Sequence, residues 1–282
     1  VSAYPPEVTK QMVKNFLAGG AAINQLAGAI DADLRIYELD LDHPTADFTT
    51  GPAMDETRTA NAMAYGMMAA EPGIDVLCLG EMGIANTSSA ALLLHRLTDI
   101  TLKDATGRGT GLTDPQLLHK RKVLMLAVLR HPDAVDPLQV MAAMGGFEIA
   151  MMTGAMLQAA SQRRVILVDG FIAGAAALVA QGLAPQVLHY MVFCHRSAER
   201  GHRLLLEHLK ARPLLDLDMR SAARVRAMLP QRQNCLLTIS CLDVLQLGAS
   251  MLEVPGAQVQ AVLGELVTRL ELGHLLARDF SQ

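Results

Sequence analysis

Short apolar runs that do not alternate with polar residues constrain this chain more than any other feature. Runs of Val, Ile and Leu with this pattern predict strands that are buried on both faces, as in a parallel sheet. They occupy residues 34–41, 74–80, 164–170 and 187–193. Segments with helical periodicity alternate with them, at residues 6–30, 54–70, 115–131 and 147–161. This alternation predicts an α/β fold with right-handed crossovers and a doubly wound, mostly parallel sheet flanked by helices.

Composition and charge narrow the class of partner. Of the 282 residues, 51% are hydrophobic, which is enough for a sizeable core. The formal net charge is -4 and no run of Lys or Arg occurs, which argues against nucleic acid because clustered cations must neutralise phosphates. No apolar stretch reaches the roughly 20 residues that cross a bilayer. We therefore expect a soluble, cytoplasmic protein that binds small molecules, without a membrane partner.

The cysteine and histidine patterns predict neither a disulfide framework nor a metal site. Cys78, Cys194, Cys235 and Cys241 form no CxxC pair, so reduced, buried thiols are expected. The histidines lack HExxH spacing, and no set of carboxylates suggests metal ligands. We expect no metal and no cofactor.

The residues that follow the second predicted strand are the first candidates for chemistry. In parallel sheets, ligands bind outside the carboxyl ends of the strands, near helix N-termini. Glycines here let the backbone approach a ligand, and side chains with hydroxyl or amide groups can donate hydrogen bonds or cap the next helix. These residues are Gly80, Gly83, Asn86, Thr87 and Ser88. They form either a phosphate cradle or an ordinary strand-to-helix turn. Glu81 favours a cradle for a reacting ligand, because a carboxylate beside a phosphate is unfavourable unless it meets developing positive charge.

Two more glycine clusters and one lysine carry weaker signals. Gly109 and Gly111, in GRGTGL, lack GxGxxG spacing and follow no clear strand. Gly145 and Gly146 precede a predicted helix and suit either close helix packing or a second set of N–H donors. Lys120, in HKRKV, lies on a predicted helix, where a solvated cationic face is the usual interpretation.

Polar residues also follow the third and fourth predicted strands. Asp169 ends the third and could bind a ligand hydroxyl, such as that of a ribose, or cap the next helix. The stretch CHRSAERGH adds His195, Ser197, Glu199 and His202. A Ser-His-Asp hydrolase is conceivable, but no GxSxG elbow presents the serine.

Eight stretches occur in the order found in one enzyme family. They are VSAYPPEVTKQMVKNFLAGGAAINQLA, TADFTTGPAM, GEMGIANTSSAA, GRGTGL, HKRKVL, GGFEIAMMTGAML, VDGFIAGAAALVA and HRSAERGHRLLLEHLKARPLLDLDMR. Together they resemble the nicotinate-nucleotide–dimethylbenzimidazole phosphoribosyltransferase family over residues 1–220. The resemblance implies a Rossmann-like fold with a small helical subdomain made from the chain ends, and a cytoplasmic homodimer. The domains would be residues 1–32 (helical subdomain), 33–220 (Rossmann-like) and 221–282 (divergent, helical).

The resemblance also implies a reaction and a set of roles. Phosphoribose would pass from nicotinate mononucleotide to 5,6-dimethylbenzimidazole, giving α-ribazole 5′-phosphate for cobalamin. Glu81 would stabilise positive charge at the sugar, and catalytic roles also fall to Lys120 and Asp169. Phosphate, ribose and nucleotide contacts would come from Gly80, Gly83, Asn86, Thr87, Ser88, Gly109, Gly111, Gly145, Gly146 and Ser197. Ser2 and Gln11 would border the benzimidazole-type base.

The chain departs from the family pattern at both ends. The family segment that precedes VSAYP, with its DHGV-like stretch, is not in this sequence. After Arg220 the family continues with LGEGxGAA, whose glutamate is the expected general base, whereas this chain reads SAARVRAML. The tail then comes either from a shifted reading frame or from a divergent end. Activity could therefore be impaired, and the alternative function is a non-catalytic nucleotide- or azole-binding protein of the same fold.

Overall fold

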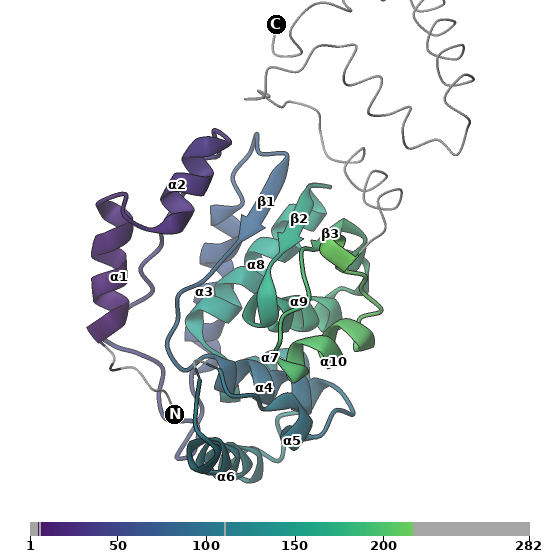
Figure 1. Ribbon diagram of the computed structural model, residues 1–282. Coiled ribbons are helices and arrows are strands. Elements are labelled where there is room, and N and C mark those ends of the chain that lie inside the picture. Colours follow the sequence, from purple (N-terminus) through teal and green to yellow (C-terminus); the bar gives the residue numbers. More distant parts are fainter. Residues whose placement is uncertain (1–4, 6, 110, 217–282) are drawn as a thin grey trace, which may run out of the picture. The chain divides into compact units, whose positions relative to one another are not determined.

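The computed structural model of the chain describes residue 5 and residues 7–109 and 111–216 (Figure 1). The chain divides into two compact units, Val1–Gly20 with Ile36–Leu217, and Ala21–Arg35 with Asp218–Gln282. In the second unit the described residues form one helix, α2 (Ala22–Ala29). The helix predicted for the tail, together with Ser2, Cys235 and Cys241, lies outside the described residues, and the predicted domain boundaries stay predictions.

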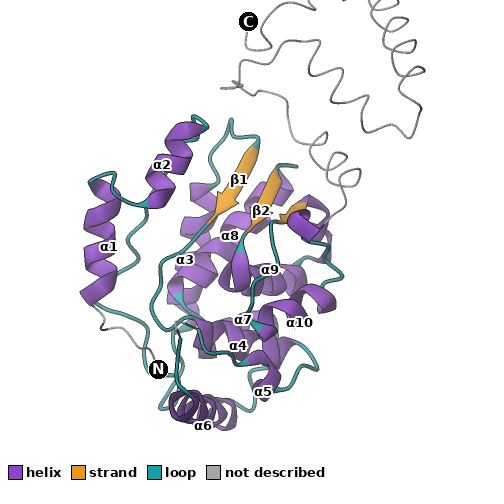
Figure 2. Ribbon diagram, viewed as in Figure 1, coloured by secondary structure: helices purple, strands orange, loops and turns teal. Residues whose placement is uncertain are grey.

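A three-stranded parallel sheet forms the centre of the first unit. Its order is β1 (Val76–Leu79), β2 (Val165–Val168) and β3 (Met191–Phe193). Leu79 pairs with Val168, and Val168 pairs with Phe193, so the three strands end level with one another. The α/β class with a parallel sheet flanked by helices is therefore confirmed (Figure 2). The three described strands follow the chain order, and the reversal that defines a doubly wound sheet stays a prediction.

Helices make up most of the rest of the first unit. They are α1 (Glu7–Leu17), α3 (Glu56–Ala69), α4 (Thr87–Leu97), α5 (Leu102–Ala105), α6 (Asp114–Arg130), α7 (Pro137–Met144), α8 (Phe147–Ser161), α9 (Gly170–Leu183) and α10 (Arg200–His208), with 3₁₀ turns at Pro185–Tyr190 and Leu214–Asp216. Small residues let α9 enter the core, where Phe171 to Ala180 are all buried. The side chains from Ser88 to Leu94 of α4 are buried as well. No helix in the described part of the chain is long and apolar enough to span a membrane.

Helices α3 and α8 cross at a contact between their backbones. A Cβ on Gly66 would lie 1.8 Å from the Met151 carbonyl oxygen, and a Cβ on Gly154 would lie 1.9 Å from the Met63 carbonyl oxygen. Only glycine fits at either position, because a side chain would overlap the facing backbone. The crossing therefore fixes where α8 lies on α3.

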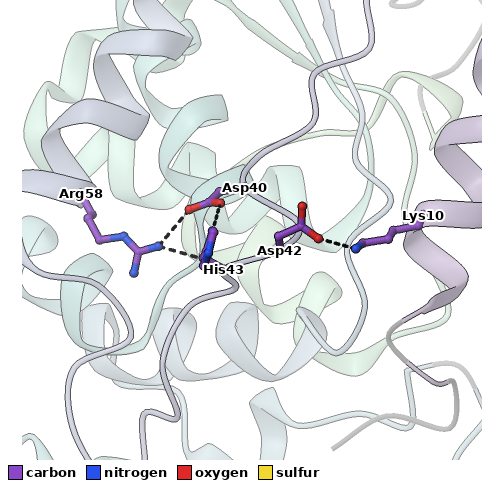
Figure 3. A network of polar contacts seen from close by, with 5 residues as sticks. All are labelled: Lys10, Asp40, Asp42, His43 and Arg58. Carbon is purple, nitrogen blue, oxygen red and sulfur yellow. Dashed lines mark hydrogen bonds and ion pairs between the residues drawn. The ribbon is translucent and has the colours of Figure 1, made fainter.

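Ion pairs on the surface of the first unit connect the segment before α3 to two helices. The Arg58 guanidinium donates to Asp40 Oδ2 at 3.3 Å and to the His43 carbonyl at 3.1 Å, and Asp42 pairs with Lys10 of α1 (Figure 3). These side chains are partly or fully exposed, so each pair contributes little to stability.

Several predictions of secondary structure were wrong. Residues 34–41 form no strand; the chain passes from the second unit to the first within this run, and Ile36 and Tyr37 are exposed. The predicted helix at 6–30 is two helices, interrupted around Gly19, which has a φ of +72°. Only Met191–Phe193 of the predicted strand at 187–193 is a strand, because Pro185 begins a 3₁₀ turn.

The prediction that the strands are buried on both faces was wrong for β1. This strand is at the edge of the described sheet, where it pairs with β2 alone, and none of its residues is fully buried. Cys78 is exposed and Cys194 is partly exposed, so the expectation of buried thiols failed at both described cysteines.

Candidate active site

The three loops that leave the carboxyl ends of the strands begin at one edge of the sheet. The level pairing of Leu79, Val168 and Phe193 starts the loops at 80–86, 169–170 and 194–199 side by side. Parallel strands are about 4.8 Å apart, so groups in adjacent loops can meet a single ligand.

In the first loop, Glu81 folds back onto its own backbone. Glu81 Oε2 accepts a hydrogen bond from the Gly83 N–H at 2.7 Å and another from the Asn86 amide. A Cβ on Gly83 would lie 2.3 Å from Asn86 Nδ2, so a side chain at this position would displace the Asn86 amide. Ala85 has a φ of +69°, a left-handed conformation that costs a non-glycine residue about 1 kcal/mol or more. Burial raises the pKa of the Glu81 carboxyl, and its two hydrogen bonds oppose that rise.

The loop runs directly into the N-terminus of α4. Asn86 is the residue before this helix, and its side chain makes no capping hydrogen bond. The Ser88 hydroxyl is buried, at 2% exposure for the residue, and has no hydrogen-bond partner among the described residues. A helix N-terminus with an unsatisfied buried hydroxyl is suited to binding an anion.

Lys120 of α6 brings a cation to the same helix start. The residue is 1% exposed, and its Nζ donates to Thr87 Oγ1 at 2.9 Å and to the Gly107 carbonyl at 3.4 Å. Burial lowers the pKa of Lys120, and the charge of Glu199 opposes that shift. The expectation of a solvated cationic face was wrong here. A buried ammonium whose hydrogen-bond acceptors are neutral can still pair with the charge of an anionic ligand.

The loop at 107–111 is fixed to the same assembly by Glu199. Glu199 Oε1 accepts from the Gly109 N–H at 2.8 Å, and a Cβ on Gly107 would lie 1.5 Å from Glu199 Oε2. A Cβ on Gly109 would lie 3.0 Å from Thr87 Oγ1, which places this loop against α4. Gly111 has a φ of +97° and open space around it.

Glu148 is a carboxylate of this site that the sequence analysis missed. It lies in the first turn of α8, two residues after Gly146, and a Cβ on Gly146 would be 2.9 Å from both of its carboxyl oxygens. Ser89 Oγ donates to the Gly145 carbonyl at 3.2 Å, which holds this turn against α4. Burial and the charge of Glu81 raise the pKa of Glu148, while hydrogen bonds from its own N–H and from Asn86 lower it. Its place two residues after the double glycine was the available signal.

Asp169 and His195 meet across the second and third loops. Asp169 Oδ1 lies 2.7 Å from His195 Nδ1, and the carboxylate makes no capping hydrogen bond to α9. Asp169 is exposed and His195 is partly exposed at the carboxyl edge of the sheet.

Ser197 forms a hydrogen-bonded pair with His202. Its backbone N–H lies 3.2 Å from His202 Nδ1, and its hydroxyl lies 2.9 Å from the same nitrogen. His202 is 1% exposed, and burial followed by the charge of His195 lowers its pKa to about 4, against the charge of Asp169. An Nδ1 that accepts from the backbone holds the loop in place, so this arrangement does not favour the hydrolase interpretation.

Two of the remaining predicted residues lie at the surface. Gly80 is exposed directly after β1, and Gln11 is exposed on α1, a helix with no buried residue. Ser2 falls outside the described residues. Within the described part of the chain, no group of three or more His, Cys, Asp and Glu side chains could hold a metal ion.

Comparisons with known proteins find relatives over most of the chain. A family model described as "Phosphoribosyltransferase" matches residues 1–229, which is further than the end at residue 220 given by the motifs. The nicotinate-nucleotide–dimethylbenzimidazole phosphoribosyltransferase of Cupriavidus taiwanensis is 53% identical over 239 residues, covering 78% of this chain and 69% of the relative. The protein of that name from Brucella anthropi is 48% identical over 221 residues, covering 78% and 65%. The crystal structure of CobT from Thermus thermophilus matches with a TM-score of 0.71 at 38% identity, covering 81% of this chain and 79% of that one.

Proposed function

Because this chain belongs to the nicotinate-nucleotide–dimethylbenzimidazole phosphoribosyltransferase family, we propose that it transfers 5-phosphoribose from nicotinate mononucleotide to 5,6-dimethylbenzimidazole. The products are α-ribazole 5′-phosphate, a part of cobalamin, and nicotinate. One observation carries the assignment to these residues: the loop that holds the Glu81 carboxylate leads directly into a helix start with a buried ammonium and an unsatisfied buried hydroxyl. A carboxylate next to an anion site suits a substrate with a phosphate and a sugar that becomes positively charged.

The anion site would hold the 5′-phosphate. The Lys120 ammonium and the Ser88 hydroxyl lie at the start of α4, whose N–H groups and dipole favour negative charge. Charge-assisted hydrogen bonds of this kind fix a phosphate firmly and orient the ribose attached to it.

Glu81 would act on the ribose. The bond from C1′ to the nicotinate nitrogen breaks, with its electron pair leaving on nicotinate, while a nitrogen of the benzimidazole forms its bond to C1′. The other nitrogen of the ring releases its proton to solvent water. Positive charge develops on the sugar because the bond to nicotinate is largely broken before the bond to benzimidazole is complete. The Glu81 carboxylate is already fixed by two hydrogen bonds and stabilises this charge without reorganising. The alternative of a non-catalytic binding protein would need the same phosphate contacts and no role for this carboxylate.

The remaining predicted residues would surround these two centres. Asp169, held by His195, would bind a ribose hydroxyl, with Ser197 beside the nucleotide. Backbone contacts to phosphate and ribose would come from Gly80, Gly83, Asn86, Thr87, Gly109, Gly111, Gly145 and Gly146. Ser2 and Gln11 would border the base. We further propose a cytoplasmic homodimer without a nucleic-acid partner. Light scattering of the purified protein tests the dimer.

A product assay tests the function. The full chain is incubated with nicotinate mononucleotide and dimethylbenzimidazole, and α-ribazole 5′-phosphate and nicotinate are quantified by mass spectrometry. Glu81→Gln should remove transfer while mononucleotide affinity stays within about tenfold, because the carboxylate acts in the transition state. Glu56→Gln, an exposed carboxylate in the first turn of α3, is the matched control. Binding of the mononucleotide without any product from the wild type would favour the binding protein instead.

A further inference from the structure

We propose that Glu199 is a positioning residue of the phosphate site, whose carboxylate holds the loop around Gly107 and Gly109 in the place where this loop supports the Lys120 ammonium. The proposal rests on the proposed function for the identity of the anion, and on the contacts of the described residues for its geometry. Glu199 lies 90 positions from Gly109 along the chain, in the stretch CHRSAERGH. The roles implied by the sequence motifs do not include this residue.

The Glu199 carboxylate contacts the loop through both of its oxygens. Its Oε1 accepts a hydrogen bond from the Gly109 N–H at 2.8 Å. Gly109 has a φ of +54°, which glycine adopts readily, so this N–H can face the carboxylate without strain. A Cβ on Gly107 would lie 1.5 Å from Oε2, so the carboxylate packs directly on the Gly107 backbone. One side chain therefore fixes two points of the loop.

The same two glycines also contact the residues that form the cation side of the site. The Gly107 carbonyl accepts from Lys120 Nζ at 3.4 Å, and a Cβ on Gly109 would lie 3.0 Å from Thr87 Oγ1. Lys120 Nζ donates to that same hydroxyl at 2.9 Å. The bond to Gly107 is the longer of the two, so a small movement of the loop away from Lys120 would break it.

These contacts set the direction of the ammonium. An ammonium has three N–H donors, and the described residues use two of them, to Thr87 and to the Gly107 carbonyl. The two acceptors fix the direction of the third donor, which is then available to an anionic ligand. If the Gly107 carbonyl moves away, the ammonium keeps the Thr87 contact and loses this orientation. Loss of the Glu199 side chain should therefore weaken anion binding through Lys120.

The two residues that follow Glu199 fix the neighbouring helix instead of the loop. Arg200 forms an ion pair with Asp104 at 3.1 Å, and a Cβ on Gly201 would lie 2.5 Å from the Ala105 carbonyl oxygen. Both partners belong to α5, which ends just before the loop. Arg200 is therefore a control for the general attachment of α10 to α5.

A simpler role for Glu199 is that of an acidic residue at the start of a helix. Glu199 is the residue before α10, and its side chain makes no capping hydrogen bond to that helix. A negative charge at a helix N-terminus stabilises the folded protein, but it does not raise the affinity of another site for an anion. Phosphate affinity therefore separates the two roles better than stability does.

Simple repulsion between charges predicts the opposite sign. A carboxylate near an anion site repels the anion, so its removal alone should strengthen phosphate binding. The charge of Glu199 also opposes the lowering of the Lys120 pKa by burial, which favours the charged ammonium. Glutamine at position 199 separates charge from contact, because it loses the charge and keeps an oxygen that can accept from the Gly109 N–H.

Calorimetric titration of the full chain with inorganic phosphate and with nicotinate mononucleotide tests the proposal. Glu199→Ala should weaken both by about tenfold or more, because small misplacements of a binding group have effects of that size. Glu199→Gln should stay within about threefold of the wild type, since the acceptor is kept. Tighter or unchanged binding in Glu199→Ala, or equal losses in the alanine and glutamine variants, would overturn the proposal.

Two matched controls come from the same helix. Glu207→Ala removes an exposed carboxylate of α10, and Arg200→Ala removes the ion pair to Asp104. Both variants should bind phosphate as tightly as the wild type does. A loss in Arg200→Ala as large as that in Glu199→Ala would overturn the specific role of Glu199. Should Glu199→Ala fail to fold, Glu199→Met fills the space without accepting a hydrogen bond and takes its place.

A double-mutant cycle tests whether Glu199 acts through Lys120. In the Lys120→Met background, Glu199→Ala should change phosphate affinity by less than about threefold, because the group that it positions is gone. Effects of the two substitutions that multiply would show that Glu199 acts independently of Lys120, and would overturn the proposal.

Amide exchange at Gly109 distinguishes failure of this inference from failure of the proposed function. Labelling arginine carbonyls with ¹³C and glycine with ¹⁵N selects the Arg-Gly pairs by NMR, which occur at 108–109 and 200–201, and Arg200→Ala removes the second signal. The Gly109 amide should exchange with solvent faster in Glu199→Ala than in the wild type. An unchanged rate would overturn the contact, whatever reaction the protein performs. Phosphate binding that depends on Glu199 in a protein that makes no α-ribazole 5′-phosphate would refute the proposed function alone.

Discussion

Replacing Lys120 by methionine should lower ligand affinity with little change in stability. The residue is 1% exposed, and its ammonium contacts only a hydroxyl and a carbonyl within hydrogen-bond distance among the described residues. Methionine has a similar length and no charge to desolvate. The substitution therefore removes both the cost of burying the ammonium and the cation that the proposed phosphate site needs.

The expected sizes follow from the contacts. A hydrogen bond to a charged group contributes about 1.5–3 kcal/mol, so affinity for inorganic phosphate and for nicotinate mononucleotide should fall about 10- to 150-fold. Removing the ammonium removes a desolvation cost of several kcal/mol. The loss of its hydrogen bonds to Thr87 and Gly107, at about 1.5–3 kcal/mol each, and of its attraction to Glu199 opposes that gain. The two effects offset each other, so the free energy of unfolding should change by no more than about 2 kcal/mol.

Calorimetric titration with phosphate and thermal unfolding without ligand measure the two effects. Lys122→Met, two residues along on the exposed side of α6, is the matched control and should change neither. The reasoning fails if Lys120→Met binds phosphate as tightly as the wild type. It also fails if the variant melts well below the wild type, since the buried ammonium would then be a net stabilising feature.

Three further outcomes are expected. Ser88→Ala should leave stability unchanged or raised by about 1 kcal/mol, since the buried hydroxyl has no described partner, and should weaken phosphate binding about 2- to 12-fold by titration. Gly154→Ala should lower the free energy of unfolding by about 3 kcal/mol in denaturant titrations because of overlap with the facing backbone, whereas Gly51→Ala, with open space around it, should have almost no effect. His202 has a pKa lowered to about 4 from 6.5, so the unfolded chain binds more protons between these values, and stability should fall by about 3 kcal/mol as pH drops through this window. A His202→Asn variant that keeps the same pH dependence would contradict the last prediction.

The parts of the fold with strong local signals were predictable. The helix expected at 147–161 is α8 with the same bounds, and that at 115–131 differs from α6 by one residue at each end. Helix caps depend on residues close together in the sequence, as Asp55 shows by accepting a hydrogen bond from the Arg58 N–H at the start of α3. A sequence pattern can therefore predict them. The strand expected at 34–41 failed because a strand needs a partner, and an apolar run alone does not specify one.

The same distinction holds for the candidate site, where contacts within one loop could be predicted and contacts between distant residues could not. Glu81, Gly83 and Asn86 contact one another within one short loop, so their pattern was visible in the sequence. The Lys120 contact to Thr87 spans 33 positions, and the Glu199 contact to Gly109 spans 90. Such contacts depend on packing, which no spacing rule reveals. Glu148 was missed for this reason, since the Glu81 charge that contributes to its raised pKa lies on another element.

The backbone contact between α3 and α8 has a practical consequence for engineering. The crossing at Gly154 lies six residues from Glu148 by the difference of 154 and 148, less than two turns along the same helix. Libraries aimed at new base specificity usually vary residues that face the ligand. Here, a side chain at Gly154 would displace α8 at its crossing with α3, although Gly154 is not in any of the loops. Such libraries should therefore keep glycine at positions 66 and 154, where a side chain would overlap the facing backbone.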